Sequence, residues 1–149
     1  MILLGLKNFV ANVLLTANIL HHFKTFFSKL NSKLSSYITT GTANGGTYYK
    51  FSNGLLICSK RISYYVNGSF SAWGNVYETP SISLGNWPHA FKSTPTATMT
   101  VQGGNTGLWT EGFYSLSATS CGTTYLCRGT SSCVAHTAYI QIIAVGTWK

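Results

Sequence analysis

The spacing of apolar residues divides the chain into two parts. From residue 1 to residue 36, apolar positions recur at alternating intervals of four and three residues, and only Thr16 interrupts them. The series is Ile2, Leu6, Phe9, Val13, Thr16, Leu20, Phe23, Phe27, Leu30 and Leu34. This segment has no proline, no acidic residue and a single glycine, Gly5. A heptad pattern sustained over this length is typical of a coiled coil, so it predicts an N-terminal helix of about 50 Å.

The pattern leaves other interpretations of this segment open. The helix could pack on another chain or on the rest of this one. Residues 1–20 are also apolar enough to suggest a signal peptide or a membrane span, although Lys7 interrupts the apolar run early. Asn8, Asn12 and Asn18 would make a span costly.

Residues 37–46 are rich in Gly and Thr and predict a linker. After them the pattern changes to short runs of strand-forming residues separated by turn signals such as Asn53-Gly54 and Asn67-Gly68. The predicted strands span residues 48–51, 55–66, 69–77, 81–84, 96–102, 108–118 and 134–148. Loops are predicted at 85–95, at 103–107 and, as an exposed loop with a short strand, at 119–133. Residues 47–149 therefore predict a mostly β domain, an antiparallel sandwich or barrel.

The charge composition narrows the classes of function. Ten Lys and Arg residues face only two acidic ones, Glu78 and Glu111, which gives a net charge of +8. The basic residues form no dense run, so nucleic-acid binding is disfavoured, whereas attraction to anionic surfaces is expected. With no Asp and two Glu in the chain, neither a Ser-His-Asp triad nor a pair of catalytic carboxylates is expected within one copy. The composition favours a structural or binding protein over an enzyme.

Three short motifs resemble the distal C-terminal (knob) domain of bacteriophage tail-fibre, or receptor-binding, proteins. They are Tyr49–Cys58, with its Ser-Asn-Gly turn, Asn86–Thr98, with Pro88 and Pro95, and the closing Ala144–Lys149. The similarity spans residues 47–149 in order, and the Cys-rich segment 121–133 has no counterpart in it.

The resemblance implies a homotrimeric β-sandwich knob at the tip of a fibre. Such a protein would be assembled in the bacterial cytoplasm and located in the virion tail. Its partners would be its own copies, other tail or baseplate proteins, and a bacterial surface polysaccharide or protein. The N-terminal heptads fit a trimeric stalk, with Leu6, Phe9, Val13, Leu20, Phe23, Phe27, Leu30 and Leu34 as trimerisation residues. Two alternatives stay open: a purely structural appendage and a polysaccharide depolymerase with a site shared between subunits.

Aromatic side chains are the main binding candidates, because aromatic faces stack on sugar rings. Among the tryptophans and tyrosines of the polar segments (Trp73, Trp87, Trp109, Tyr114 and Tyr125), the receptor-binding candidates are Trp109, Tyr114 and Tyr125, together with Arg128. Trp73 and Trp148 are expected in the core.

The cysteines and histidines suggest little chemistry. Cys121, Cys127 and Cys133 are spaced by six residues, with His136 nearby. Structural zinc sites usually contain closer Cys pairs, so buried or loop thiols are expected in preference to a metal site or a disulfide. Cys58 is expected in the core. The pair His21-His22 is expected to be solvated, and no cofactor, metal or catalytic residue is predicted.

Overall fold

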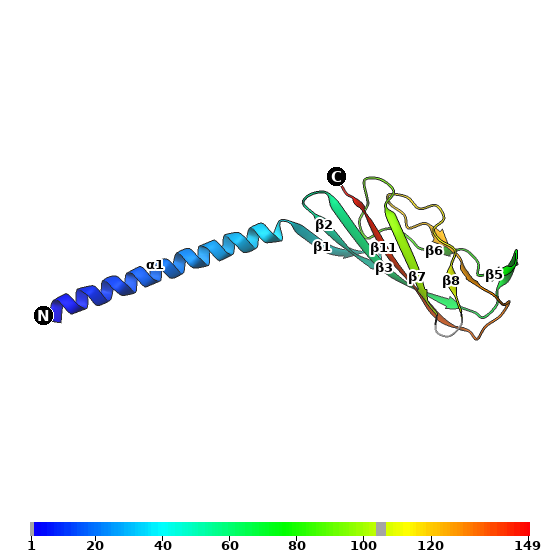
Figure 1. Ribbon diagram of the computed structural model, residues 1–149, viewed down its shortest axis with the longest axis horizontal. Helices are drawn as coiled ribbons and strands as arrows, with labels where there is room; N and C mark the ends of the chain where they lie inside the picture. Colours follow the sequence, from blue (N-terminus) through cyan, green and yellow to red (C-terminus); the bar gives the residue numbers. More distant parts are fainter. Residues whose placement is uncertain (1, 104–106) are drawn as a thin grey trace. The chain divides into compact units, whose positions relative to one another are not determined.

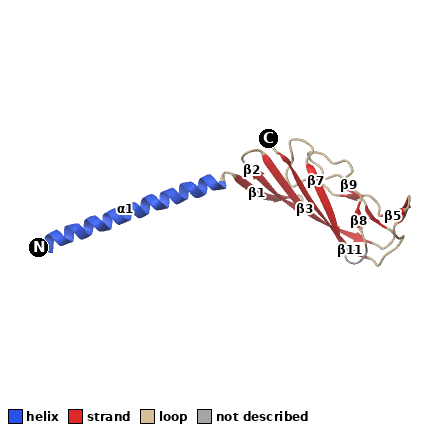
Figure 2. Ribbon diagram, viewed as in Figure 1, coloured by secondary structure: helices blue, strands red, loops and turns tan. Residues whose placement is uncertain are grey.

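The computed structural model describes residues 2–103 and 107–149, and the side chains of residues 18–103 and 107–149. The chain forms two compact units, residues 1–38 and residues 39–149. The first contains helix α1 (Ile2–Ser35) and the second contains the β-strands (Figures 1 and 2). The predicted class, mostly β with antiparallel sheets after one N-terminal helix, is confirmed.

Helix α1 ends in a serine-rich turn. Ser35 and Ser36 donate their hydroxyls to the carbonyls of Asn31 and Lys33, and the backbone N–H of Tyr37 donates to the carbonyl of Leu34. These bonds satisfy carbonyls that the last helical turn leaves unpaired, and the charge of Lys33 suits the negative end of the helix dipole. Within the part of the chain that the structure describes, no helix has the length and apolarity that crossing a membrane requires.

The main sheet contains five strands. They are β1 (Ile38–Ala43), β2 (Gly46–Phe51), β3 (Leu55–Val66), β7 (Thr96–Gln102) and β11 (His136–Thr147), in the order β1-β2-β3-β11-β7. Strands β3 and β11 are antiparallel along their whole length, from the pair Val66–His136 to the pair Leu55–Thr147. The ribbon in Figure 1 shows these two long strands at the centre of the sheet.

Strand β1 corrects the prediction of a linker at 37–46. Residues 38–43 include three threonines, which favour strands. Asn44 and Gly45 follow with φ angles of 51° and 74°. Positive φ at both residues is the conformation of a tight type I′ hairpin turn, which connects β1 to β2. Gly and Thr in this segment therefore form a hairpin.

Smaller sheets form the second layer. Strands β4 (Ser71–Trp73), β5 (Val76–Glu78), β10 (Leu126–Arg128) and β8 (Trp109–Thr110) form a four-stranded sheet in the order β4-β5-β10-β8. Strands β6 (Ile82–Ser83) and β9 (Thr123–Thr124) form a pair. The core between the two layers consists of Leu56, Cys58, Val66, Ile82, Leu84, Trp87, Phe91, Cys121, Leu126, Ala138, Ile140, Ile142 and Ala144.

The boundaries of two long strands agree with prediction, β11 is shorter than the predicted 134–148, and the short strands differ. Strands β3 and β7 have the predicted bounds. The strand predicted at 69–77 is instead the hairpin β4–β5, which turns at Gly74, where φ is 58°. Of the strand predicted at 108–118 only β8 forms, with one isolated bridge at Tyr114. The predicted loop at 119–133 contains two strands, and Cys121, Leu126 and Cys127 in it are fully buried. Of the loop predicted at 103–107, residues 104–106 lie outside the described residues.

Candidate functional site

The four-stranded sheet places a row of polar and aromatic residues on the face opposite to the core. Cys127 lies between Glu78 on β5 and Trp109 on β8, as its direct cross-strand partners. Because side chains alternate along a strand, Leu126 points into the core and Cys127 points away from it. Cys127 is nevertheless fully buried, so other side chains cover it on this outer face.

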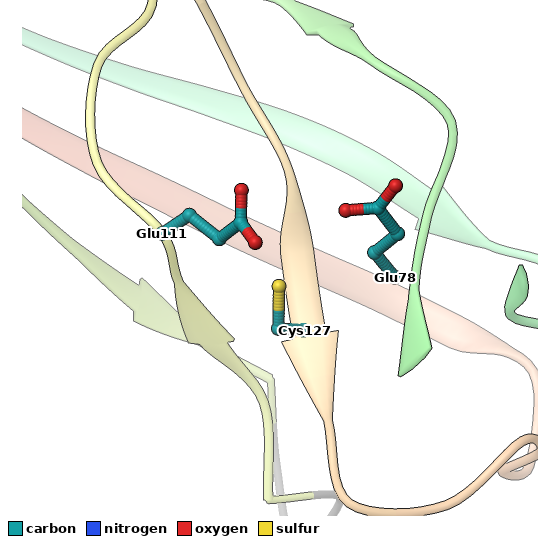
Figure 3. A group of neighbouring side chains, drawn as sticks. All are labelled: Glu78, Glu111 and Cys127. Carbon is teal, nitrogen blue, oxygen red and sulfur yellow. The ribbon is translucent and has the colours of Figure 1, made fainter. Parts of the chain in front are cut away.

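The covering groups include both carboxylates of the chain. One ligand-capable atom each of Glu78, Glu111 and Cys127 lies within 4.8 Å of the other two. Figure 3 shows the Cys127 sulfur between the carboxylate groups of Glu78, from β5, and Glu111, from the segment after β8. Both glutamates are half-buried, so the cluster is shielded from solvent without being sealed.

Tyr114 orients one of the carboxylates. Its hydroxyl donates a hydrogen bond of 2.6 Å to Glu111 Oε2, and this bond raises the pKa of Tyr114 to about 12. The other oxygen, Glu111 Oε1, is buried and has no hydrogen-bond partner. A buried acceptor without a partner is uncommon in folded proteins and calls for an explanation.

The electrostatics of the cluster are unfavourable in the protein alone. The ligand oxygens of the two carboxylates lie within 4.8 Å of each other. At that distance two negative charges repel each other by about 3 kcal/mol at an effective dielectric constant of about 20, and by more if they are closer. Among the described residues no ion pair links either carboxylate to a basic residue. Burial raises the pKa of the Cys127 thiol to about 12, and the charge of Glu111 and a hydrogen bond between the thiol and the Glu111 carboxylate add to this effect. The thiol is thus protonated at neutral pH.

The sequence contained no signal for this cluster. Its members are separated by 33 and 16 positions, and two glutamates in 149 residues argued against any paired-carboxylate site. They meet because β10 pairs with both β5 and β8, and strand register across three short strands is a property of the tertiary fold.

Three of the four receptor-binding candidates lie near this cluster. Trp109 and Tyr114 are 43% and 44% exposed. Tyr125 packs edge-on against Tyr114, with ring centroids 5.3 Å apart. Arg128 differs, because it lies one position after Cys127 and so points to the opposite face. Its guanidinium carbon is 5.6 Å from the ring centroid of Phe70, and its Nε and Nη1 atoms are buried without a hydrogen-bond partner.

The predictions for the other tryptophans are partly wrong. Trp73, expected in the core, is 54% exposed, because it stands at the tip of the β4–β5 hairpin. Trp87, considered for sugar stacking, is 2% exposed and belongs to the core. Trp148 packs against the core and donates its indole N–H to the carbonyl of Phe51, 2.9 Å away.

The regularly spaced cysteines do not share a site. Cys121 and Cys58 lie in the core, as predicted for Cys58, whereas Cys127 lies on the other side of its sheet and Cys133 is half-buried. All four are free thiols. The ring nitrogen of His136 is 2.8 Å from the carbonyl oxygen of Val134. Cys121, Cys127 and Cys133 are regularly spaced in the sequence but lie in different surroundings in the fold.

A second surface feature lies on the outer face of the five-stranded sheet. A shallow groove of about 430 Å³ crosses strands β2, β3, β11 and β7. Its lining combines the polar residues Thr47, Ser59, Thr98, Thr100 and Gln141 with Lys60, Arg61 and Ile143, and more of its exposed surface is apolar than polar. The Arg61 guanidinium lies 4.0 Å from the centroid of the neighbouring Tyr139 ring.

Comparisons with known proteins gave matches only among solved structures: no protein-family model and no curated protein matches the sequence. The fold is similar to an N-truncated R1-type pyocin tail fibre, with 14% identity and a TM-score of 0.47, over 80% of this chain and 94% of that one. It is also similar to a structure of C-terminal residues of the R2 pyocin fibre of P. aeruginosa, with 14% identity and a TM-score of 0.42. That match covers 77% of this chain and 28% of the fibre structure.

Proposed function

We propose that this chain is a non-enzymatic attachment protein of the tail-fibre type, which forms a homotrimer through α1 and binds a bacterial surface glycan through its β domain. The observation that carries the proposal is the exposed apolar seam of α1. The sequence motifs that resemble tail-fibre knobs indicate which kind of oligomeric protein this is.

The seam requires a partner. Its members with described side chains are all exposed, at 69%, 57%, 59%, 49% and 67% for Leu20, Phe23, Phe27, Leu30 and Leu34. Leu6, Phe9 and Val13 lie outside the residues whose side chains are described. Most of the stability of a helix in a protein comes from burying its apolar face, and a seam with heptad spacing buries itself against copies of the same helix.

The surface of the β domain suits a glycan. It carries few charges and many hydroxyl and amide groups, and exposed Trp109 and Tyr114 offer flat apolar faces for sugar rings. The net charge of +8 favours approach to anionic bacterial envelopes. Other tail or baseplate proteins would anchor the fibre within the virion, and a purely structural appendage is the alternative in which those proteins are the only partners.

One observation favours an enzyme as a second candidate. Glu78 and Glu111 meet within a single chain, with carboxylate oxygens within 4.8 Å of each other. The two carboxyl groups of retaining glycosidases are also close together, at roughly 5 Å. A depolymerase would thus not need a site shared between subunits. Attachment remains the better-supported function, because Glu111 Oε1 is shielded from solvent and Cys127 lies between the two carboxylates.

The test combines the oligomeric state with binding. Light scattering on the purified full chain is expected to give three times the chain mass, and a monomer would overturn the trimer. On an array of bacterial surface polysaccharides, Trp109→Ala is expected to lose binding. The matched control is Tyr65→Ala, which removes an aromatic side chain that is 66% exposed on β3.

Equal binding by both variants would remove Trp109 from the site, and no binding by the wild type would favour the structural appendage. Release of reducing ends from a bound polysaccharide, abolished by Glu78→Gln, would establish the enzyme instead.

A further inference from the structure

The cluster of Glu78, Glu111 and Cys127 has the composition of a metal site. Two carboxylates and a thiol supply three potential ligands from three different segments: strand β5, the segment after β8, and strand β10. Their ligand atoms lie within 4.8 Å of one another. Around a tetrahedral zinc ion the corresponding separations are about 3.5 Å, given Zn–S and Zn–O bonds of roughly 2.3 and 2.1 Å. Side-chain rotations that move the ligand atoms by about 1 Å would bring them to these separations.

Other observations point to a cation in this place. Glu111 Oε1 is a buried oxygen without a hydrogen-bond partner, and its side chain reaches toward the Cys127 sulfur (Figure 3). Cys127 is fully buried, yet it lies outside the apolar core. The chain has ten basic residues. Among the described residues, however, none of them forms an ion pair with Glu78 or Glu111. A divalent cation would satisfy the buried oxygen and neutralise both carboxylates at once.

We propose that Glu78, Glu111 and Cys127 bind one zinc ion, which joins the short strands of the four-stranded sheet. A thiolate ligand favours zinc over magnesium or calcium, which prefer six or more oxygen ligands. Binding breaks the S–H bond of Cys127, releases its proton to solvent and forms a Zn–S bond. The fourth position is left to water, which reaches the site beside the half-buried glutamates.

The surroundings support a structural role for the ion. Strands β4, β5 and β10 have three residues each and β8 has two, so few backbone hydrogen bonds hold this sheet together. The hydrogen bond from Tyr114 to Glu111 Oε2 would fix the orientation of a ligand carboxylate, as outer-shell partners do in known zinc sites. The ion would therefore also hold the segment that carries Trp109 and Tyr114.

The experiment uses the full chain without a histidine tag, stripped of metal with a chelator and titrated with Zn²⁺ alone. Competition with a chromogenic chelator is expected to show one zinc per chain. Glu78→Gln, Glu111→Gln and Cys127→Ser are each expected to weaken binding by at least about tenfold. Cys133→Ser removes a free thiol outside the cluster and is the matched control, which should bind zinc like the wild type.

Co²⁺ provides a direct readout of the sulfur ligand. The wild type loaded with Co²⁺ is expected to show the near-ultraviolet thiolate-to-cobalt absorption, and Cys127→Ser to lack it. Zinc is also expected to raise the melting temperature of the wild type and not that of Glu111→Gln.

The proposal does not depend on the Cys127 variant folding. The two Glu→Gln variants keep the side-chain shape, and circular dichroism of the metal-free proteins reports whether the fold is kept. Absence of zinc binding by the wild type would overturn the proposal. So would undiminished binding by both Gln variants, which would place the ion elsewhere, for example at His21-His22. Zinc binding is measured without glycan and none of these outcomes bears on trimer formation, so failure of the zinc site leaves the proposed attachment function standing.

Discussion

At the scale of single residues, burial decides what each side chain does. Trp87 is the largest fully buried side chain among the described residues. Its indole N–H donates to the Ser117 carbonyl at 2.9 Å, and its ring packs edge-on against Phe91, with centroids 5.5 Å apart. Cys121 lies in the same core, where burial raises the pKa of its thiol from 9.0 to about 11.

The raised pKa of Cys121 predicts a loss of stability at alkaline pH. In the unfolded chain this thiol ionises near pH 9, while in the folded protein it stays protonated up to about pH 11. Its contribution to the free energy of unfolding is therefore complete below pH 9 and is lost as the pH rises from 9 through 11. The loss is at most about 1.4 kcal/mol per pH unit. Cys127, whose pKa is raised to about 12, acts in the same direction.

Urea unfolding of the metal-free protein between about pH 8 and pH 10 measures this effect. The free energy of unfolding is expected to fall as the pH rises, and it is expected to fall less steeply for Cys121→Ala than for the wild type. Cys133→Ser is the control, because it removes a thiol that is not fully buried. Its free energy of unfolding should depend on pH as that of the wild type does. Identical slopes in all three proteins would contradict the assignment.

At the scale of elements, strand β11 shows how one alternating run serves two faces. Ala138, Ile140, Ile142 and Ala144 are buried in the core, whereas Ile143 is 52% exposed and Val145 42% exposed on the outer face. Its neighbours β3 and β7 continue the same alternation through their register with it. A shift by one residue would exchange the two faces, so burial of the core face holds the register.

Adjacent isoleucines of β11 offer a matched test of this arrangement. Ile142→Ala is expected to lower the free energy of unfolding by about 2–5 kcal/mol, because it leaves a cavity in the core. Ile143→Ala, the same change one residue later, is expected to cost less than about 1 kcal/mol. Denaturant unfolding measures both, and equal losses would mean that the outer face is also covered.

At the scale of the whole molecule, the proposed assembly depends on α1. The exposed residues of the helix include Ile19 and Phe26 beside the seam, so the apolar stripe is broader than a single heptad seam. A wider stripe buries more surface in an assembly of several helices. This agrees with the proposed trimer and predicts that charges on the stripe prevent assembly.

Leu30→Glu is expected to reduce the mass measured by light scattering from trimer to monomer, because it places a carboxylate in each copy of the buried seam. Lys29→Glu, at the exposed neighbouring position, introduces the same residue outside the seam and should leave the trimer intact. Dissociation by both variants would attribute the effect to charge alone. Assembly retained by Leu30→Glu would exclude the seam as the contact.

Local patterns in the sequence were sufficient for the helix and the long strands. Turn signals on either side of 55–66 and alternation over 96–102 predicted β3 and β7 with correct bounds, because a strand with one buried face carries that face in its own residues. The heptads likewise predicted α1, and the apolar context of Cys58 predicted its burial.

Only the tertiary structure decided the short strands and the candidate site. Trp73 and Trp87 exchange their expected places. Trp87 is buried in the core, whereas Trp73 is exposed on β4, the edge strand of the four-stranded sheet. Strands of two or three residues carry too little pattern to identify, and their pairing depends on partners distant in the chain. That pairing brings Glu78, Glu111 and Cys127 together. Sequence alone determines which faces must be buried, whereas the packing of those faces determines which polar groups meet.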